Sequence, residues 1–187
     1  MPLMVDALKR GLRRLRRDTR GVAAIEFALI APVAILLYCG FTELTMAMMA
    51  ERRAAHAASV VGDLVAQALN GQTTKQEVLN TFSVANAIMS PFPVGTLKLR
   101  VTSIQADANA VPQMKWTQVS GGYPQMPAGA VSGFPANLLT AGDSVIQADV
   151  QYDYTSPLRM TLPNALTYRS TFYLRPRNGV TVACPDC

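Results

Sequence analysis

Two cysteines close to the C-terminus have the spacing of a redox pair. Cys184 and Cys187 are separated by Pro185 and Asp186. In redox proteins such a pair opens a helix, whose N-terminus lowers the pKa of the attacking thiol. Here the second cysteine is the last residue of the sequence, so we expect no helix after this pair. We therefore expect either a structural disulfide between Cys184 and Cys187 or a frayed oxidised tail, both of which an oxidising compartment permits.

The other residues that could bind a ligand have simpler interpretations. His56, the only histidine, is one helical turn from Arg52 and has no partner fixed by spacing. We expect it to be a solvated helix residue. Asp149 and Asp153 could hold a cation, but strand alternation also explains them as the polar face of a sheet. No phosphate loop, catalytic triad or metal cluster is apparent, so we predict no enzyme activity, no cofactor and no metal site.

A single carboxylate interrupts an apolar segment near the N-terminus. Glu26 is the only charged residue between Val22 and Thr42. About 20 helical residues rise roughly 30 Å, the hydrocarbon thickness of a bilayer. Because a charge at the centre of a span costs about 2.5 to 3.5 kcal/mol, we expect Glu26 to have a specific partner. The alternative is a carboxyl that snorkels or stays protonated near the interface without any partner.

The positive charge of the chain is concentrated in front of this segment. Residues 1–21 carry seven basic and two acidic residues, and the rest of the chain carries ten of each. A folded nucleic-acid-binding domain needs a basic face, so we predict no nucleic-acid partner. The positive-inside rule places the N-terminus in the cytoplasm. We predict a basic cytoplasmic leader (1–21), a transmembrane helix in the lipid bilayer (22–42), a periplasmic helical region (43–91) and a periplasmic β-rich region (92–187).

A secretory signal peptide is the competing interpretation of the same N-terminal pattern. It also has a basic region followed by an apolar one. The cleavage site would be poor, because the small-residue triplet at 45–47 follows Glu43 closely and the better one at 55–57 lies too far from the apolar core. We therefore favour a retained transmembrane helix.

The helical pattern continues beyond the apolar segment. Apolar residues recur at helical spacing over residues 57–68 (Ala57, Val60, Val61, Leu64, Val65 and Ala68). Asn70-Gly71 then gives a stop signal. Within the span, Pro32 lacks an amide hydrogen and predicts a kink or local unwinding.

A second helix is predicted after this stop. Thr74 and Glu77 have the spacing of a capping box, which marks a helix N-terminus. The helix should end near Ser90-Pro91. Its expected apolar stripe consists of Val78, Phe82, Ala85 and Met89.

The remaining sequence has the two-residue period of β-strands. Alternation predicts strands over 97–102, 146–154 and 167–175, and a weaker one over 114–119. Four glycines and three prolines in 121–135 indicate a long surface loop. The predicted fold class is α+β: a long N-terminal transmembrane helix continuing into a periplasmic domain of helices packed on a small, mostly antiparallel sheet.

The N-terminal residues carry a family resemblance. Gly21, followed five residues later by Glu26 and then Phe27, resembles the prepilin peptidase recognition pattern of type IV pilin-like proteins. The order of features is most similar to the TadE-like family of tight-adherence pilus assembly proteins, the minor pseudopilins of that system. The resemblance rests on residues 16–21, 24–29, 31–32 and 40–43, with weaker signatures at 152–158 and 174–177.

This resemblance implies processing of the precursor. A prepilin peptidase would cut between Gly21 and Val22, and a glycine suits an extended backbone in a protease site. The new amine of Val22 would lie one helical turn from Glu26. Glu26 and Phe27 would then serve recognition, or pairing within or between subunits.

The resemblance also implies partners and a location. The expected partners are the prepilin peptidase, other pilins or pseudopilins and inner-membrane pilus assembly proteins. The expected location is the bacterial inner membrane, with entry into the pilus left open. The alternative function is an uncleaved, membrane-anchored periplasmic binding or scaffold module.

Overall fold

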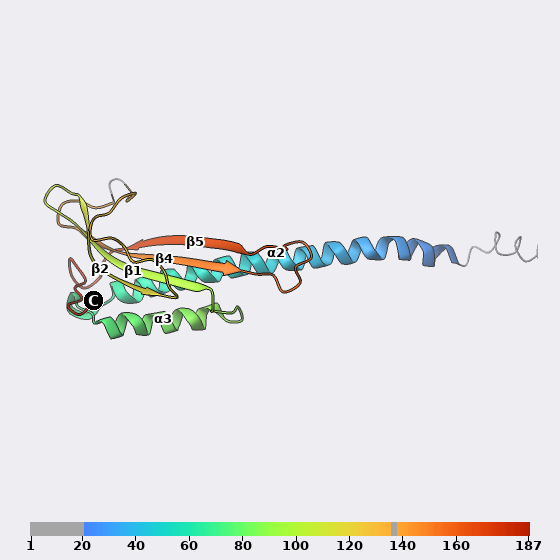
Figure 1. The fold of residues 1–187 in the computed structure, drawn as a ribbon, viewed down its shortest axis with the longest axis horizontal. Helices are drawn as coiled ribbons and strands as arrows, with labels where there is room; N and C mark the ends of the chain where they lie inside the picture. Colours follow the sequence, from blue (N-terminus) through green and yellow to red (C-terminus); the bar gives the residue numbers. More distant parts are fainter. Residues whose placement is uncertain (1–20, 136–137) are drawn as a thin grey trace, which may run out of the picture. The chain divides into compact units, whose positions relative to one another are not determined.

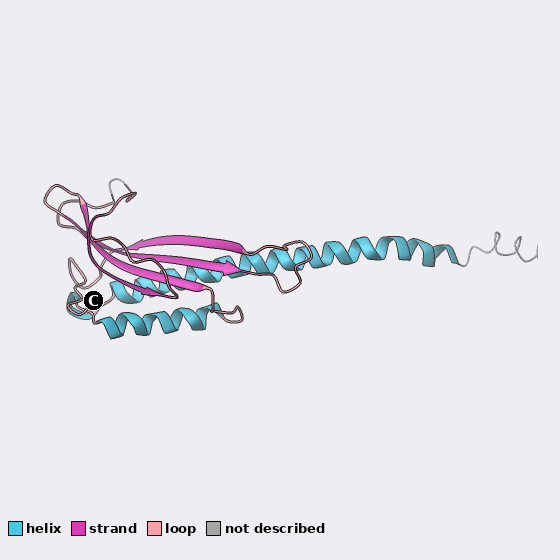
Figure 2. Cartoon of the chain, viewed as in Figure 1, coloured by secondary structure: helices cyan, strands magenta, loops and turns pink. Residues whose placement is uncertain are grey.

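A computed structural model of the chain describes residues 21–135 and 138–187. The chain divides into two compact units, one ending at Thr42 and one running from Glu43 to Cys187. The fold class is α+β, as predicted (Figure 2). The elements are α2 (Val22–Ala66), the short 3-10 helix η2 (Leu69–Gly71), α3 (Lys75–Met89), β1 (Leu97–Ala106), β2 (Pro112–Ser120), β3 (Gly129–Ala130), β4 (Ser144–Tyr154) and β5 (Leu166–Leu174).

The first unit contains the apolar part of α2. An 18-residue window of this helix has a mean hydropathy of 2.3, none of it buried, so the helix is long and apolar enough to cross a membrane. Its large apolar side chains are exposed, as in Leu36 and Tyr38. The local unwinding that we expected at Pro32 is absent, because α2 is unbroken through this residue.

In the second unit, α2 buries a face of small residues. Ala50, Ala54 and Ala57 are at most 1% exposed. Small side chains allow the helix to approach the sheet closely. At Gly62 the helix lies close to the sheet, since an added Cβ would lie 2.9 Å from the Cβ of Ala148.

Our prediction for the end of this helix was partly wrong. α2 ends at Ala66, and the predicted stop at Asn70-Gly71 falls in η2, where Asn70 has a positive φ of 54°. Leu64, expected on the buried stripe, is 40% exposed, because the buried face follows the alanines and Val61 instead.

Helix α3 forms as predicted. Thr74 and Glu77 make the reciprocal hydrogen bonds of a capping box, and the helix begins at Lys75. It ends at Met89, next to the expected Ser90-Pro91. The buried residues are the predicted stripe of Val78, Phe82, Ala85 and Met89.

The strands form one antiparallel sheet in the order β3-β2-β1-β4-β5. All four predicted strands are present. Figure 1 shows α3 and the second part of α2 along the sheet. The inner face of β1 and β4 joins the helices in the main core, through residues such as Leu99, Val101 and Val150. In the opposite face, Arg100 of β1 is paired in register with Asp149 of β4.

The segment 121–135 is more than the surface loop that we expected. It contains β3, which pairs with β2. It also packs on the outer face of the sheet, where Val131 and Phe134 contact a second core cluster that includes Ile104 and Val145.

Candidate functional site

The predicted processing site lies where helix α2 begins. Gly21 precedes the helix, which starts at Val22. A Cβ added to Gly21 would meet no atom within 4 Å among the described residues. Val22 is 47% exposed and Phe27 is 72% exposed. Among the residues that the structure describes, none therefore obstructs the backbone at Gly21.

Glu26 lies four residues after Val22 in the same helix and is exposed. Side chains four residues apart share one face of a helix, with their Cβ atoms about 5 to 6 Å apart. The side chains of Val22 and Glu26 therefore lie on the same face of α2. Apart from Gly21, the predicted basic leader lies outside the described residues.

A second carboxylate, Glu43, is the first residue of the second unit and is buried in it. Its side chain is 1% exposed. The Ser156 hydroxyl donates to it at 2.7 Å, and the Thr161 hydroxyl donates to the other oxygen. The Glu43 carboxylate also accepts hydrogen bonds from three backbone amides, those of Met160 at 3.0 Å, Thr161 at 2.7 Å and Leu162 at 3.0 Å. The carboxylate therefore organises the β4–β5 loop, which we define as residues 155–165.

These donors change the acidity of Glu43. The Thr161 hydroxyl contributes most, and with the Ser156 hydroxyl and the backbone amides it lowers the pKa of Glu43 to about 2, although burial acts in the opposite direction. A carboxylate that accepts several hydrogen bonds is stabilised in its charged form. Glu43 is thus ionised at neutral pH.

Sequence reasoning missed this role of Glu43. We noted Glu43 at the end of the span, and Ser156 in a weak C-terminal signature, without connecting them. The two residues are 113 positions apart. The available signal was an acidic residue directly after an apolar span, together with the hydroxyl residues Ser156 and Thr161 downstream.

The prediction of a polar, solvated strand face was wrong for Asp149. This side chain is 2% exposed and accepts a hydrogen bond from Arg100 Nε at 2.9 Å. The Thr171 hydroxyl donates to it at 2.6 Å and Gln147 Nε2 at 3.0 Å. Arg100 in turn lies 4.8 Å from the centre of the Tyr123 ring. The loop segment at Tyr123 covers Arg100, and the buried carboxylate is fully used in structural contacts.

Asp153, on the same face of β4, is more exposed. It accepts a hydrogen bond from the Thr167 hydroxyl at 2.6 Å, and Lys98 Nζ lies 3.9 Å away. His56 is exposed on α2. The structure does not bring Asp149, Asp153 and His56 together in one ligand site.

The two C-terminal cysteines are bonded to one another in the structure. The Cα atoms of Cys184 and Cys187 are 5.4 Å apart across this disulfide. Asp186, between them, accepts a hydrogen bond at 3.0 Å from the amide of Lys75, the first residue of α3. The ligand atoms of Cys184, Asp186 and Cys187 lie within 4.8 Å of one another, but the sulfurs are bonded together and offer no thiolate to a metal.

The preceding C-terminal residues join the sheet to the helices. The carbonyl of Val182 accepts hydrogen bonds from Trp116 Nε1 at 2.8 Å and from the Ser103 hydroxyl at 3.3 Å. Ala183 exchanges backbone hydrogen bonds with Gly71 and Thr73. The C-terminal segment thus has a structural function in this unit.

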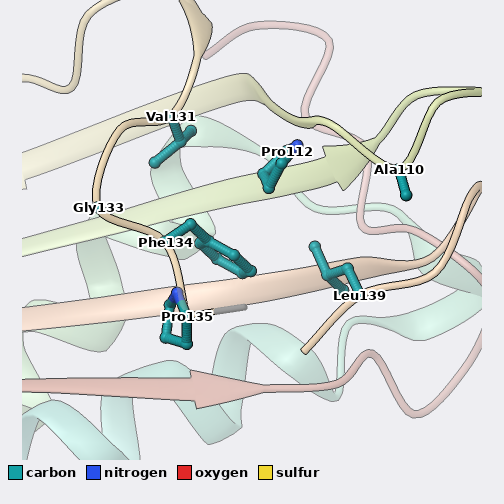
Figure 3. Close-up of a pocket in the computed structure, with 7 residues that line it drawn as sticks. All are labelled: Ala110, Pro112, Val131, Gly133, Phe134, Pro135 and Leu139. Atoms are coloured by element: carbon teal, nitrogen blue, oxygen red, sulfur yellow. The ribbon is translucent and has the colours of Figure 1, made fainter. Parts of the chain in front are cut away.

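A hollow of about 210 Å³ lies between the sheet and the segment 121–135, which packs on its outer face (Figure 3). Its lining has no titratable side chain and consists of Ala110, Pro112, Val131, Gly133, Phe134, Pro135 and Leu139. The hollow therefore offers no acid, base or nucleophile for catalysis.

Comparison with known proteins gives a match to a protein family. No curated protein and no solved structure matches the chain. The family model described as TadE-like protein matches residues 21–62. The matched segment begins at Gly21 and contains Glu26 and Glu43. Over residues 21–62 the chain is thus similar to TadE-like proteins, which confirms the family resemblance seen in its sequence.

Proposed function

We propose that this chain is a minor pseudopilin that acts as a structural subunit in assembly of a tight-adherence pilus. The carrying observation is the TadE-like match, which starts at Gly21, the residue directly before helix α2. In this proposal a prepilin peptidase removes residues 1–21. The apolar helix anchors the mature chain in the inner membrane, and residues 43–187 lie in the periplasm.

The new amine at Val22 gives Glu26 a function. At an effective dielectric constant of about 20, opposite charges about 4 Å apart gain about 4 kcal/mol. This gain is comparable with the roughly 2.5 to 3.5 kcal/mol cost of a charge at the centre of a span. The amine of the same chain or of a neighbouring subunit therefore makes Glu26 tolerable in the bilayer.

A structural rather than catalytic role is supported by the second unit, in which two buried carboxylates and the C-terminal cysteines take part in contacts that hold the fold together. Glu43 organises the β4–β5 loop, Asp149 pairs with Arg100, and the C-terminal cysteines form a disulfide. In this proposal the partners of the unit are other pilins or pseudopilins and inner-membrane assembly proteins.

Processing can be tested in the native host by comparing Gly21→Leu with the wild type. A bulky residue at the cut should block the peptidase, so the variant should keep its precursor mass while the wild type is shortened. Gly95→Leu is the matched control, because an added Cβ at Gly95 also meets no atom within 4 Å among the described residues. It should be shortened like the wild type.

If the wild type and Gly21→Leu both keep the full precursor mass, the processing proposal is refuted. That result would favour the uncleaved membrane-anchored module. If Gly95→Leu also fails to be shortened, the effect of Gly21→Leu cannot be assigned to the cut.

A further inference from the structure

The β4–β5 loop combines tight anchoring with an exposed apolar tip. Three consecutive backbone amides, at residues 160–162, donate to Glu43. Leu158 is 49% exposed and Met160 is 52% exposed, and Arg159 between them is also exposed. The loop is therefore held in place by its backbone while it presents two apolar side chains and one cation to the surroundings.

The position of Glu43 in the chain indicates what that surface meets. Glu43 directly follows Thr42, the last residue of the predicted span. The amide of Met160 is 3.0 Å from the Glu43 carboxylate. Leu158 is two residues from Met160, so its Cα lies at most about 7 Å further along the chain. Leu44, the next helix residue, is 50% exposed as well. These apolar side chains thus lie close to Glu43, the residue that directly follows the predicted span in the sequence.

We propose that the β4–β5 loop is a second membrane contact, in which Leu158 and Met160 enter the interfacial layer of the lipid bilayer and Arg159 binds a lipid phosphate. Apolar side chains at this depth gain free energy from burial among the headgroups and upper acyl chains. A cation beside them is attracted to anionic headgroups. The contact would fix the rotation and tilt of the folded unit on the membrane. This inference rests on insertion of residues 22–42 in a bilayer, which is part of the proposed function.

The other end of the second unit provides a matched control. Val180 is 69% exposed, and its neighbour Asn178 donates to the carbonyl of Gln67 at 3.0 Å. Gln67 is 24 residues after Glu43, which corresponds to roughly 36 Å along a helix. Val180 is thus an apolar residue that is even more exposed than Leu158, but it lies far from the residue that follows the span.

Tryptophan fluorescence in brominated lipids tests the contact. The full chain is placed in phosphatidylcholine–phosphatidylglycerol vesicles that carry bromine either near the headgroups or near the chain ends. Leu158→Trp and, separately, Met160→Trp are compared with Val180→Trp, and with Val33→Trp in the span. The wild type supplies the background of the buried Trp116. We expect headgroup-proximal bromine to quench Leu158→Trp and Met160→Trp, and to leave Val180→Trp unquenched.

The outcomes separate this inference from the proposed function. If Val33→Trp is quenched but both loop variants behave like Val180→Trp, the loop contact is refuted and the anchor stands. If Val33→Trp is not quenched either, both are refuted. Loop emission that depends on protein concentration, without lipid quenching, would assign the surface to a second copy of the chain and refute the lipid contact.

The contribution of Arg159 has its own readout. Arg159→Gln, introduced beside Leu158→Trp, should reduce quenching in vesicles that contain phosphatidylglycerol and have a smaller effect in pure phosphatidylcholine. The same quenching with and without Arg159 in both lipids would refute the phosphate contact.

Discussion

The carboxylate of Glu43 accepts a hydrogen bond at 2.7 Å from the amide of Thr161, although 118 residues separate the two in the sequence. This bond, with four others, ties the first turn of the folded unit to the β4–β5 loop. We expect Glu43→Gln to lower the melting temperature by several degrees, because the amide group would point hydrogens at donors that now face oxygens. Unfolding of the full chain in detergent, followed by Trp116 fluorescence, measures this effect. Glu51→Gln, an exposed carboxylate on the same helix, should change little.

The stability that Glu43 provides should depend on pH. Its pKa falls from 4.5 to about 2 on folding. A carboxylate with a depressed folded-state pKa stabilises the fold fully above its unfolded-state pKa, and this stabilisation is lost as the pH falls toward the folded-state value. The difference in melting temperature between the wild type and Glu43→Gln should therefore be constant from pH 7 to about pH 5 and shrink from there to about pH 2. A difference that stays unchanged down to pH 2 would contradict this account.

Asp149 and Asp153 should respond very differently to the same change. Asp149→Ala removes one partner of a buried ion pair with Arg100 and should cost about 3 to 5 kcal/mol of unfolding free energy. Asp153→Ala removes an ion pair with Lys98 in which both side chains are about one-third exposed, and it should cost about 0 to 1 kcal/mol. Denaturant unfolding of both variants measures the two costs. Equal costs would mean that the outer face at Asp149 is solvated.

Helix α3 and strand β4 show what local sequence patterns can and cannot predict. Helix α3 was predicted with its cap and buried stripe, because Thr74, Glu77 and the stripe residues all lie within 16 consecutive positions. Alternation likewise located β4. The burial of Asp149 was missed, because alternation assigns a residue to one face of a sheet without indicating what covers that face. The covering residues come from the loop near Tyr123.

The Glu43 site was missed for a related reason. Hydrogen bonds to backbone amides depend on where a distant loop is placed, and any residue except proline can supply the donor. Only the hydroxyls of Ser156 and Thr161 leave a trace in the sequence. The two-residue strand β3 was missed because it is too short for alternation to be recognised.

The close contact of α2 with the sheet should make Gly62 intolerant of a side chain. A Cβ there would lie 2.9 Å from the Cβ of Ala148 and 2.5 Å from Leu174 Cδ1. Overpacking of this kind costs about 1 to 3 kcal/mol. The higher helix propensity of alanine than of glycine offsets about 1 kcal/mol of this cost at most. We expect Gly62→Ala to be destabilising in denaturant unfolding, whereas Gly95→Ala should be close to neutral. A stabilised Gly62→Ala variant would show that the helix can move away from the sheet.

The C-terminal disulfide should stabilise the folded unit moderately. Closing a loop of four residues corresponds to about 2 kcal/mol in the chain-entropy model. The Cys184→Ser/Cys187→Ser double variant should therefore unfold at lower denaturant concentration than the wild type. Part of the lost stability should come from Asp186, whose carboxylate accepts a hydrogen bond from the amide of Lys75. Adding Asp186→Ala to the double variant should then cost less than Asp186→Ala alone in the wild type. Equal costs would show that the disulfide does not position Asp186.

The central claim is that the mature chain begins at Val22 and pairs its new amine with a carboxylate at Glu26. N-terminal sequencing of the protein purified from membranes of its native host tests this most directly. The proposed function predicts a mature chain whose first residue is Val22, in a strain with an intact prepilin peptidase, and the full precursor in a strain without one. A chain that begins at Met1 in both strains would contradict the claim.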